Sequence, residues 1–314
     1  MRWCLWVYLA ACGSVPTNKP ADAPQGKDDA AIDAAGSSSG SPCDVTKSFG
    51  TPMSLPGIDG SGDQTWGWFS PDELTIYYVA EVPGKAISNV YAAQRASIGD
   101  AFGSGTRLAG VMSDTEDTST PKVTADGLTL FVTADTASGS DRIFVATRST
   151  AVADFGTPSL VAAINSTGAD DSDPWINADA TVMYLASVRT GSVMFDLYTA
   201  TRSSPTGTFT TPVPITELES GDVDDVPVAS ADGLEIFFAS NRSTTSNGRN
   251  DIYHATRATT SDPFSAISKV SELSTDTSEE FPTWLSPDRC TLMYSSDAAG
   301  GSGGYDIWIA TRPQ

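Results

Sequence analysis

The stretch that decides the fold is PVASADGLEIFFASNRSTTSNGRNDIYHATR, residues 227–257. Its last seven residues, DIYHATR, return four more times in altered form, each time closed by an arginine. Each of these arginines follows the one before it by 53 to 55 residues: Arg95, Arg148, Arg202, Arg257 and Arg312. A constant step of this length indicates a chain that is built from structural repeats.

Every repeat contains the same four pieces. A first segment ends in a polar turn at an aspartate, as at Ser230 to Asp232, where turn-forming residues gather. An apolar segment such as Leu234 to Ser240 follows, and its lack of alternation predicts a strand buried on both faces. The third piece is the strand that ends in the arginine, and the fourth opens with phenylalanine: Phe102, Phe155, Phe209 and Phe264. Four strands in each of five repeats predict an all-β fold, a five-bladed β-propeller.

The turn motifs carry a family resemblance. Ser70-Pro71-Asp72, Ser286-Pro287-Asp288 and Ser230-Ala231-Asp232-Gly233 each precede an apolar strand, and Asp-Ile-Tyr or Asp-Ile-Trp follows two of them. This pattern resembles the WD-like repeats of the TolB propeller family over residues 64–314. The resemblance implies a binding module of the bacterial cell envelope, whose partner is a protein or a glycan.

The ends of the repeat series predict how the ring closes. Phe49 precedes Phe102 by one period, whereas no fourth piece follows the last arginine, Arg312. We therefore expect residues 47–54 to pair antiparallel with residues 305–311 as the outermost strand of the last blade. Closure of this kind leaves no open array whose unpaired strand edges face solvent.

The first 42 residues predict export and lipid anchoring. Arg2 and a short apolar run precede Leu9-Ala10-Ala11-Cys12, which resembles the lipobox of bacterial lipoproteins, so residues 1–12 are predicted to be the signal and Cys12 the lipidated residue. Residues 13–42 contain few large apolar residues and are predicted to be a disordered tether. The propeller would span 43–314 as a monomer, held by its lipid at the outer membrane.

Two of the four cysteines remain for the folded part. Cys43 precedes the closing strand and Cys290 lies in the fifth repeat, so both belong to the same expected blade. In an exported protein such a pair forms a disulfide; the alternative is two separate thiols.

Charge and composition disfavour several classes of function. A net charge of −21 argues against binding nucleic acid through electrostatics and is compatible with a cationic partner or a metal. The single histidine, His254, falls in the middle of an expected strand. A catalytic system that depends on histidine, or a zinc site with histidine ligands, is therefore disfavoured.

Acidic residues gather just before the first strand of every repeat. If equivalent positions lie on one ring around the axis, five carboxylates converge there and could bind a ligand or a hard cation such as calcium. The alternative is structural, with the carboxylates accepting backbone N–H bonds or pairing with the repeated arginines. The candidates for this ring, one in each repeat, are Asp63, Asp117, Asp171, Asp224 and Glu279.

Two functions remain open on this basis. The first is a non-catalytic envelope lipoprotein whose propeller binds a protein or a glycan, without a cofactor other than calcium. The second is a carbohydrate-active enzyme, a glycosidase or lyase, that uses carboxylates of the channel. A carboxylate pair with one strongly raised pKa would favour the enzyme. The equivalent Trp68, Trp175 and Trp284 are expected to fill space between blades rather than to stack on a sugar.

Overall fold

The computed structural model describes residues 43–58, 62–112, 116–135, 139–189, 194–242 and 248–314. These residues form twenty β-strands in five antiparallel four-stranded sheets, and none of them is helical. It follows that no described segment is a helix suited to crossing a bilayer. The expected lipobox with Cys12 and the expected tether, residues 13–42, lie outside the described residues.

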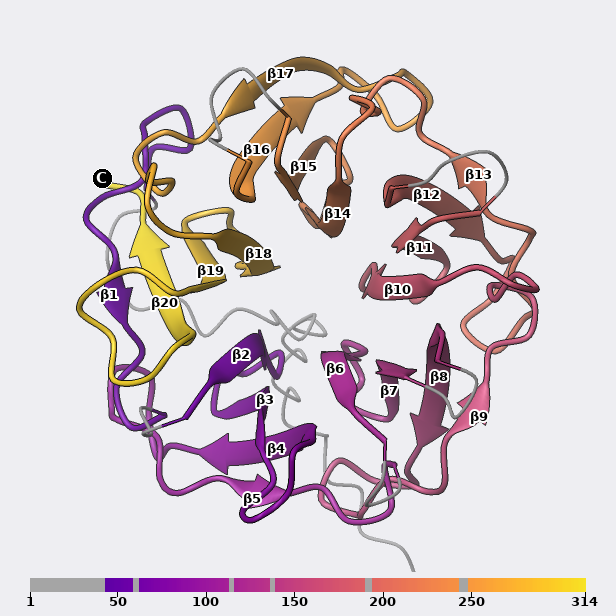
Figure 1. Cartoon of the computed structure of the whole chain (residues 1–314), viewed down its shortest axis with the longest axis vertical. Helices are drawn as coiled ribbons and strands as arrows, with labels where there is room; N and C mark the ends of the chain where they lie inside the picture. The colour runs from indigo at the N-terminus through magenta and orange to yellow at the C-terminus, as the bar shows by residue number, and fades with distance from the viewer. Residues whose placement is uncertain (1–42, 59–61, 113–115, 136–138, 190–193, 243–247) are drawn as a thin grey trace, which may run out of the picture. The chain divides into compact units, whose positions relative to one another are not determined.

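Each sheet is one blade, and the blades follow one another around the axis (Figure 1). The first blade contains β2 (Gln64–Phe69), β3 (Thr75–Glu81), β4 (Ser88–Gln94) and β5 (Thr106–Arg107). The second contains β6 (Thr118–Val123), β7 (Thr129–Asp135), β8 (Asp141–Thr147) and β9 (Ser159–Leu160). The third contains β10 (Asp171–Ile176), β11 (Val182–Ser187), β12 (Asp196–Thr201) and β13 (Val213–Pro214).

The fourth blade contains β14 (Asp224–Ala229), β15 (Glu235–Ser240), β16 (Asp251–Thr256) and β17 (Ser265–Lys269). The fifth contains β18 (Glu280–Leu285), β19 (Thr291–Ser296), β20 (Asp306–Thr311) and β1 (Met53–Ser54). The five-bladed, all-β prediction is thus confirmed. The first strand of each blade, β2, β6, β10, β14 or β18, lies nearest the axis (Figure 1).

The second strand of each blade forms the core between neighbouring blades. In β15, Ile236, Phe237 and Phe238 are all buried although they point alternately to the two faces of the sheet. Both faces are covered because a blade lies on either side, which explains the uninterrupted apolar sequence. The three equivalent tryptophans are also buried, as expected: Trp68, Trp175 and Trp284.

The polar turn between the first and second strands is closed by its own side chains. In the fourth blade, Asp232 Oδ1 accepts hydrogen bonds from the Ser230 hydroxyl at 2.6 Å and from the Leu234 N–H at 3.1 Å. The Ser230 Oγ in turn accepts the Glu235 N–H at 2.9 Å. Serine and aspartate two residues apart recur because each satisfies backbone donors that the turn would leave unpaired.

The repeated arginines fasten this turn to the outer strand. Arg257 Nε donates to the Gly233 carbonyl at 2.7 Å, and its guanidinium carbon lies 4.3 Å from the centroid of the Phe264 ring. A further bond, from Arg257 to the Tyr184 hydroxyl at 2.9 Å, reaches the preceding blade. All five arginines stack in this way on the phenylalanine of their own blade. They form no ion pair with the five candidate carboxylates of the acidic ring. The expectation that those carboxylates pair with the repeated arginines is therefore wrong.

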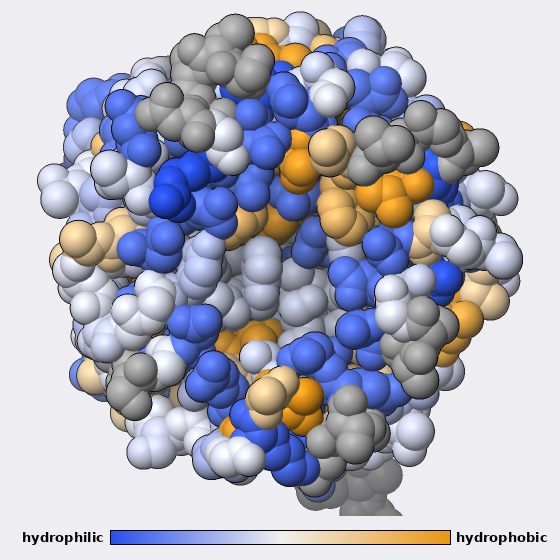
Figure 2. All heavy atoms as spheres, in the orientation of Figure 1, coloured by the Kyte–Doolittle hydropathy of each residue, from blue (hydrophilic) through white to orange (hydrophobic). Residues whose placement is uncertain are grey.

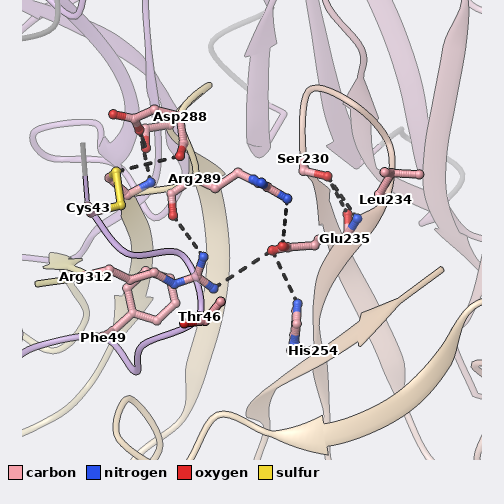
Figure 3. Close-up of polar contacts among 12 residues, drawn as sticks. Cys43, Thr46, Phe49, Ser230, Leu234, Glu235, His254, Asp288, Arg289 and Arg312 are labelled. Atoms are coloured by element: carbon pink, nitrogen blue, oxygen red, sulfur yellow. Dashed lines mark hydrogen bonds and ion pairs between the residues drawn. A yellow bond between two sulfur atoms is a disulfide. The ribbon is translucent and has the colours of Figure 1, made fainter. Parts of the chain in front are cut away.

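The ring closes as the repeat series predicts. Strand β1 is the outermost strand of the fifth blade and runs antiparallel to β20, with Met53 opposite Ile309 (Figure 1). The Gly50 N–H donates to the Thr311 carbonyl at 2.9 Å. Beside this seam a disulfide joins Cys43 to Cys290, whose Cα atoms are 5.7 Å apart (Figure 3).

The innermost strands share a bulge that the sequence did not reveal. Pairing with the second strand shifts register at the same place in every blade. In four blades the bulged residue adopts a left-handed conformation, which is strained for residues other than glycine. These residues are Trp66 (φ 58°), Thr120 (φ 46°), Asp173 (φ 53°) and Val226 (φ 48°). The fifth blade has Pro282 at this position, whose ring excludes positive φ.

Candidate functional site

A cavity of about 410 Å³ opens among the first strands of the fifth, first and second blades. Its walls come from the beginnings of β2, β4, β6, β8, β18 and β20 and from the ends of β3, β7 and β19. Viewed along the ring axis, the centre of the molecule is hollowed, and hydrophilic residues surround most of the hollow (Figure 2). The blades thus bring residues that are distant in the sequence to one concave surface.

One wall of the cavity is aromatic. Trp66 and Phe281 have ring centroids 5.5 Å apart, and Phe281 and Tyr305 have centroids 6.2 Å apart. The Trp66 backbone is held in its strained bulge by a hydrogen bond from its N–H to Ser295 Oγ at 2.9 Å. These three partly buried rings form a continuous apolar surface beside the axis.

The other walls carry the carboxylates of Asp63, Asp117, Asp135 and Asp141. Asp63 accepts the Tyr305 N–H at 3.0 Å, and Asp117 accepts the Ser88 N–H at 2.7 Å. Each of these bonds ties a blade to the blade before it. Asp141 differs, because burial raises its pKa to about 6, with further contributions from the negative charges of Asp170 and Asp135.

The polar lining consists of acceptors and hydroxyl groups. No lysine, arginine, histidine or amide side chain is among the described residues that line the cavity; beside the four carboxylates stand Thr65, Ser88, Thr118, Ser119, Ser295 and the Tyr305 hydroxyl. Thr118 is only 1% exposed, and within the described part of the chain its hydroxyl has no hydrogen-bond partner. A buried polar atom without a partner costs free energy.

The five carboxylates of the expected ring occupy two different positions. Asp63, Asp117 and Glu279 stand one residue before the first strand, whereas Asp171 and Asp224 are its first residue. Asp63 and Asp117 line the cavity, and Glu279 accepts the Tyr305 hydroxyl at 2.6 Å. The third-blade residue equivalent to Asp63 and Asp117 is Asp170, which accepts the Asp141 N–H at 3.1 Å.

Asp171 and Asp224 form ion pairs and hydrogen bonds within their own blades. Both are fully buried, and Asp171 pairs with Arg189 while Asp224 pairs with Arg242. Each also accepts a backbone N–H from the preceding loop, at 2.6 Å from Ser166 and 2.8 Å from Ser220. The structural alternative predicted that these carboxylates accept backbone N–H bonds, and this part is confirmed for both residues. Arg189 and Arg242, however, are not the arginines that recur in every repeat. One residue of displacement along a strand moves a side chain to the opposite face.

The described residues contain no cluster of three or more His, Cys, Asp or Glu side chains that is placed to hold a metal ion. Calcium binding at the rim stays a prediction.

Three charged residues that the sequence did not single out as a group, Lys122, Asp173 and Asp225, lie on the innermost strands outside the cavity lining. Lys122, on β6, is 1% exposed; its Nζ donates to the Thr283 carbonyl on β18 at 2.9 Å and lies 4.8 Å from the centroid of the Trp68 ring. Burial lowers the pKa of Lys122 to about 7, against the favourable charge of Asp173. Lys122 occupies the position of the repeated tryptophans, and this exception was the available signal.

Asp173, on β10, and Asp225, on β14, lie close enough for their charges to interact. Burial raises the pKa of Asp173 to about 6. Burial also raises the pKa of Asp225 well above its ordinary value, and the negative charge of Asp173 adds to this effect. Asp225 Oδ1 has no hydrogen-bond partner among the described residues. The channel thus holds carboxyl groups whose protonated forms are stabilised.

His254 belongs to a different cluster, at the seam between the fourth and fifth blades (Figure 3). The Glu235 carboxylate lies among His254, Arg289 and Arg312, at 3.4, 3.0 and 3.9 Å. Burial alone would raise the pKa of Glu235, but these three neighbours hold it below its ordinary value. The cluster joins two blades and has no part in the cavity.

A scan against protein-family models gives no match, and no curated protein matches the chain. Solved structures do match. TolB from Acinetobacter baumannii is 15% identical over 81% of this chain and 55% of its own, with a TM-score of 0.46. The catalytic domain of a Coprinopsis cinerea GH62 α-L-arabinofuranosidase is 12% identical over 84% and 96%, with a TM-score of 0.54. A Podospora anserina α-L-arabinofuranosidase in complex with cellotriose is 13% identical over 86% and 98%, also with a TM-score of 0.54.

These likenesses place the chain in the class of five-bladed β-propellers. The chain spans about half the length of the TolB protein that it matches. Identities this low show the fold alone, and a propeller fold carries many unrelated activities. Function therefore has to be argued from the cavity and the channel.

Proposed function

We propose that this propeller is a carbohydrate-binding module of the bacterial cell envelope and that the cavity beside Trp66 is its binding site. The observation that carries the proposal is an aromatic wall opposite a set of hydrogen-bond acceptors. Sugars present apolar C–H faces, which pack against aromatic rings, and hydroxyl groups, which donate to carboxylates.

The size and shape of the site favour a glycan over a protein surface. A volume of about 410 Å³ falls within the roughly 300–1,000 Å³ that is usual for small-molecule sites. A stable protein interface instead buries roughly 800 Å² on each partner over a broad patch.

Binding to a panel of neutral and amino oligosaccharides, followed by calorimetry on the best ligand, tests the proposal. Trp66→Ala removes part of the aromatic wall and should weaken binding about tenfold, which corresponds to about 1.4 kcal/mol. Leu160→Ala, at an exposed position on β9, is the matched control and should bind like wild type. Absence of binding at millimolar glycan, or full affinity in Trp66→Ala, would contradict the proposal.

A second candidate, glycoside hydrolysis or lysis, is favoured by one observation. Asp225 has a pKa well above its ordinary value, as a general acid requires, and the nearby Asp173, with a pKa of about 6, would be the ionised carboxylate of the pair at pH 7. Release of reducing ends from a glycan that binds, lost in both Asp173→Asn and Asp225→Asn while binding persists, would establish this activity. A bound glycan that stays intact on prolonged incubation would exclude it.

Anchoring to the envelope is part of the proposal and depends on Cys12. Cys12→Ser should move the protein from the membrane fraction to the soluble envelope fraction. A wild-type protein that is already soluble and retains residues upstream of Cys12 would remove the lipid anchor from the proposal.

A further inference from the structure

We propose that the cavity selects glycans that carry a free, protonated amino group; this inference rests on the proposed carbohydrate function. It concerns the charge of the ligand, which the aromatic wall alone does not determine. The argument comes from the carboxylates, from the cations near them and from the aromatic rings opposite.

None of the carboxylates of the cavity forms a salt bridge with a described cationic side chain, although the charge of Arg142 acts to lower the pKa of Asp141. Asp63, Asp117, Asp135 and Asp141 line the cavity, and no described cationic side chain does so. The nearest arginine in sequence, Arg142, is directed elsewhere: its NH1 group donates to the backbone carbonyls of Asp141 and Ala169 and lies 3.8 Å from Asp171. Four like charges around a partly enclosed space favour the entry of a cation.

Two of the four carboxylates, those of Asp135 and Asp141, are left for a ligand. Asp63 and Asp117 already accept backbone N–H groups. At Asp141, burial and the charges of Asp170 and Asp135 disfavour the ionised form more than the charge of Arg142 favours it, so a bound ammonium would relieve the repulsion.

The aromatic wall suits the same ligand. An ammonium group is attracted to the faces of aromatic rings as well as to carboxylates, and Trp66, Phe281 and Tyr305 provide such faces. A bare metal ion would gain no ligands from this wall, and the described residues hold no metal-binding cluster. An N-acetylated sugar would bring no positive charge to the carboxylates, and a uronic acid would be repelled by them.

Calorimetry with three trisaccharides of equal length tests the inference: β-1,4-linked glucosamine, its N-acetylated form and cellotriose. The glucosamine trisaccharide should bind at least tenfold more tightly than the other two at pH 7 and low salt. This preference should shrink as salt is raised, and it should shrink below about pH 6 as Asp141 takes up a proton.

Asp141→Asn provides the decisive variant, because no backbone N–H of the described residues donates to its carboxylate. It should weaken binding of the glucosamine trisaccharide several-fold more than binding of cellotriose, whose hydroxyl groups need only an uncharged acceptor. Asp154→Asn, at an exposed position away from this cavity, is the matched control and should keep the wild-type preference.

The outcomes separate the inference from the function on which it rests. Equal affinity for the three trisaccharides, each weakened by Trp66→Ala, would overturn the amino-group selectivity and leave carbohydrate binding intact. Binding of none would overturn both. A lysine tripeptide that binds as tightly as the amino sugar would show recognition of charge alone and would also overturn the inference.

Discussion

The guanidinium carbon of Arg312 lies 4.5 Å from the centroid of the Phe49 ring, although 263 positions separate the two residues (312 − 49). The same contact measures 4.3 to 4.7 Å in the other four blades, where the partners are seven residues apart in sequence. The fifth blade therefore repeats the geometry of its neighbours with strands from opposite ends of the described chain. This closure makes the stability of the whole ring depend on the seam (Figure 3).

Removal of the Cys43–Cys290 disulfide should lower the free energy of unfolding of the ring. The bond closes a loop of 247 residues, for which the chain-entropy model gives about 5 kcal/mol. The double variant Cys43→Ser/Cys290→Ser, followed by denaturant unfolding, measures the effect. Unchanged stability, in the variant or in wild type after reduction, would show that β1 is held by its hydrogen bonds and by Phe49 alone.

Arg257→Lys should lower the free energy of unfolding by about 2 kcal/mol, although the positive charge is kept. Lysine cannot donate from Nε to the Gly233 carbonyl while its side chain covers the Phe264 ring and reaches the Tyr184 hydroxyl. Urea unfolding compares this variant with Arg249→Lys, whose side chain is 42% exposed and should change stability by less than about 0.5 kcal/mol. Equal effects of the two changes would mean that the repeated arginine acts only through its charge.

Ionisation of Glu280 should make the free energy of unfolding depend on pH. Burial raises the pKa of this carboxyl to about 7, so the folded state keeps a proton that the unfolded state has lost. Stability from this group is complete below about pH 4.5 and is lost as pH rises to about 7. At about 1.4 kcal/mol per pKa unit the loss amounts to roughly 3 kcal/mol.

Glu280→Gln should flatten this part of the profile, because glutamine resembles the protonated acid and can still bond Ser278. Unfolding free energies measured from pH 4 to 8 provide the check. Glu81→Gln, at an exposed position, should follow wild type. Parallel profiles for wild type and Glu280→Gln would place the pH dependence elsewhere.

Lys122 should make the protein more stable as pH rises, at higher pH than the effect of Glu280. Its folded pKa of about 7 lies below the ordinary 10.5, so the unfolded state binds the extra proton between these values and stability rises with pH. The gain approaches about 5 kcal/mol at the upper end. Lys122→Met should lack this rise when unfolding is followed from pH 7 to 10, whereas Lys85→Met, at an exposed position, should retain it.

The carboxylates show where sequence reasoning lost accuracy. Asp171 and Asp63 were placed on one ring because both precede an apolar strand, but they differ by one residue in register. One then pairs with Arg189 inside its blade, and the other lines the cavity. Repeat spacing varies by a residue or two through loop length, and a side-chain position on a strand does not tolerate that error.

The aromatic wall was not accessible to repeat alignment for a related reason. Trp66 is the bulged residue of its strand, Phe281 is equivalent to Thr65, and Tyr305 is equivalent to Ser88. Three non-equivalent positions meet only because neighbouring blades are rotated about a common axis and the bulge redirects the side chain.

The sequence by itself determined the all-β class, the five blades, the burial of the second strands and the closure by Phe49 and its neighbours. These features follow from local patterns, turn chemistry and a constant period, which each repeat restates. The tertiary structure alone decided which carboxylates face the cavity, that Lys122 crosses the channel to Thr283 and that three aromatic rings share a wall. Such relations join residues far apart in the chain, and bulges, loop lengths and burial set them rather than any motif.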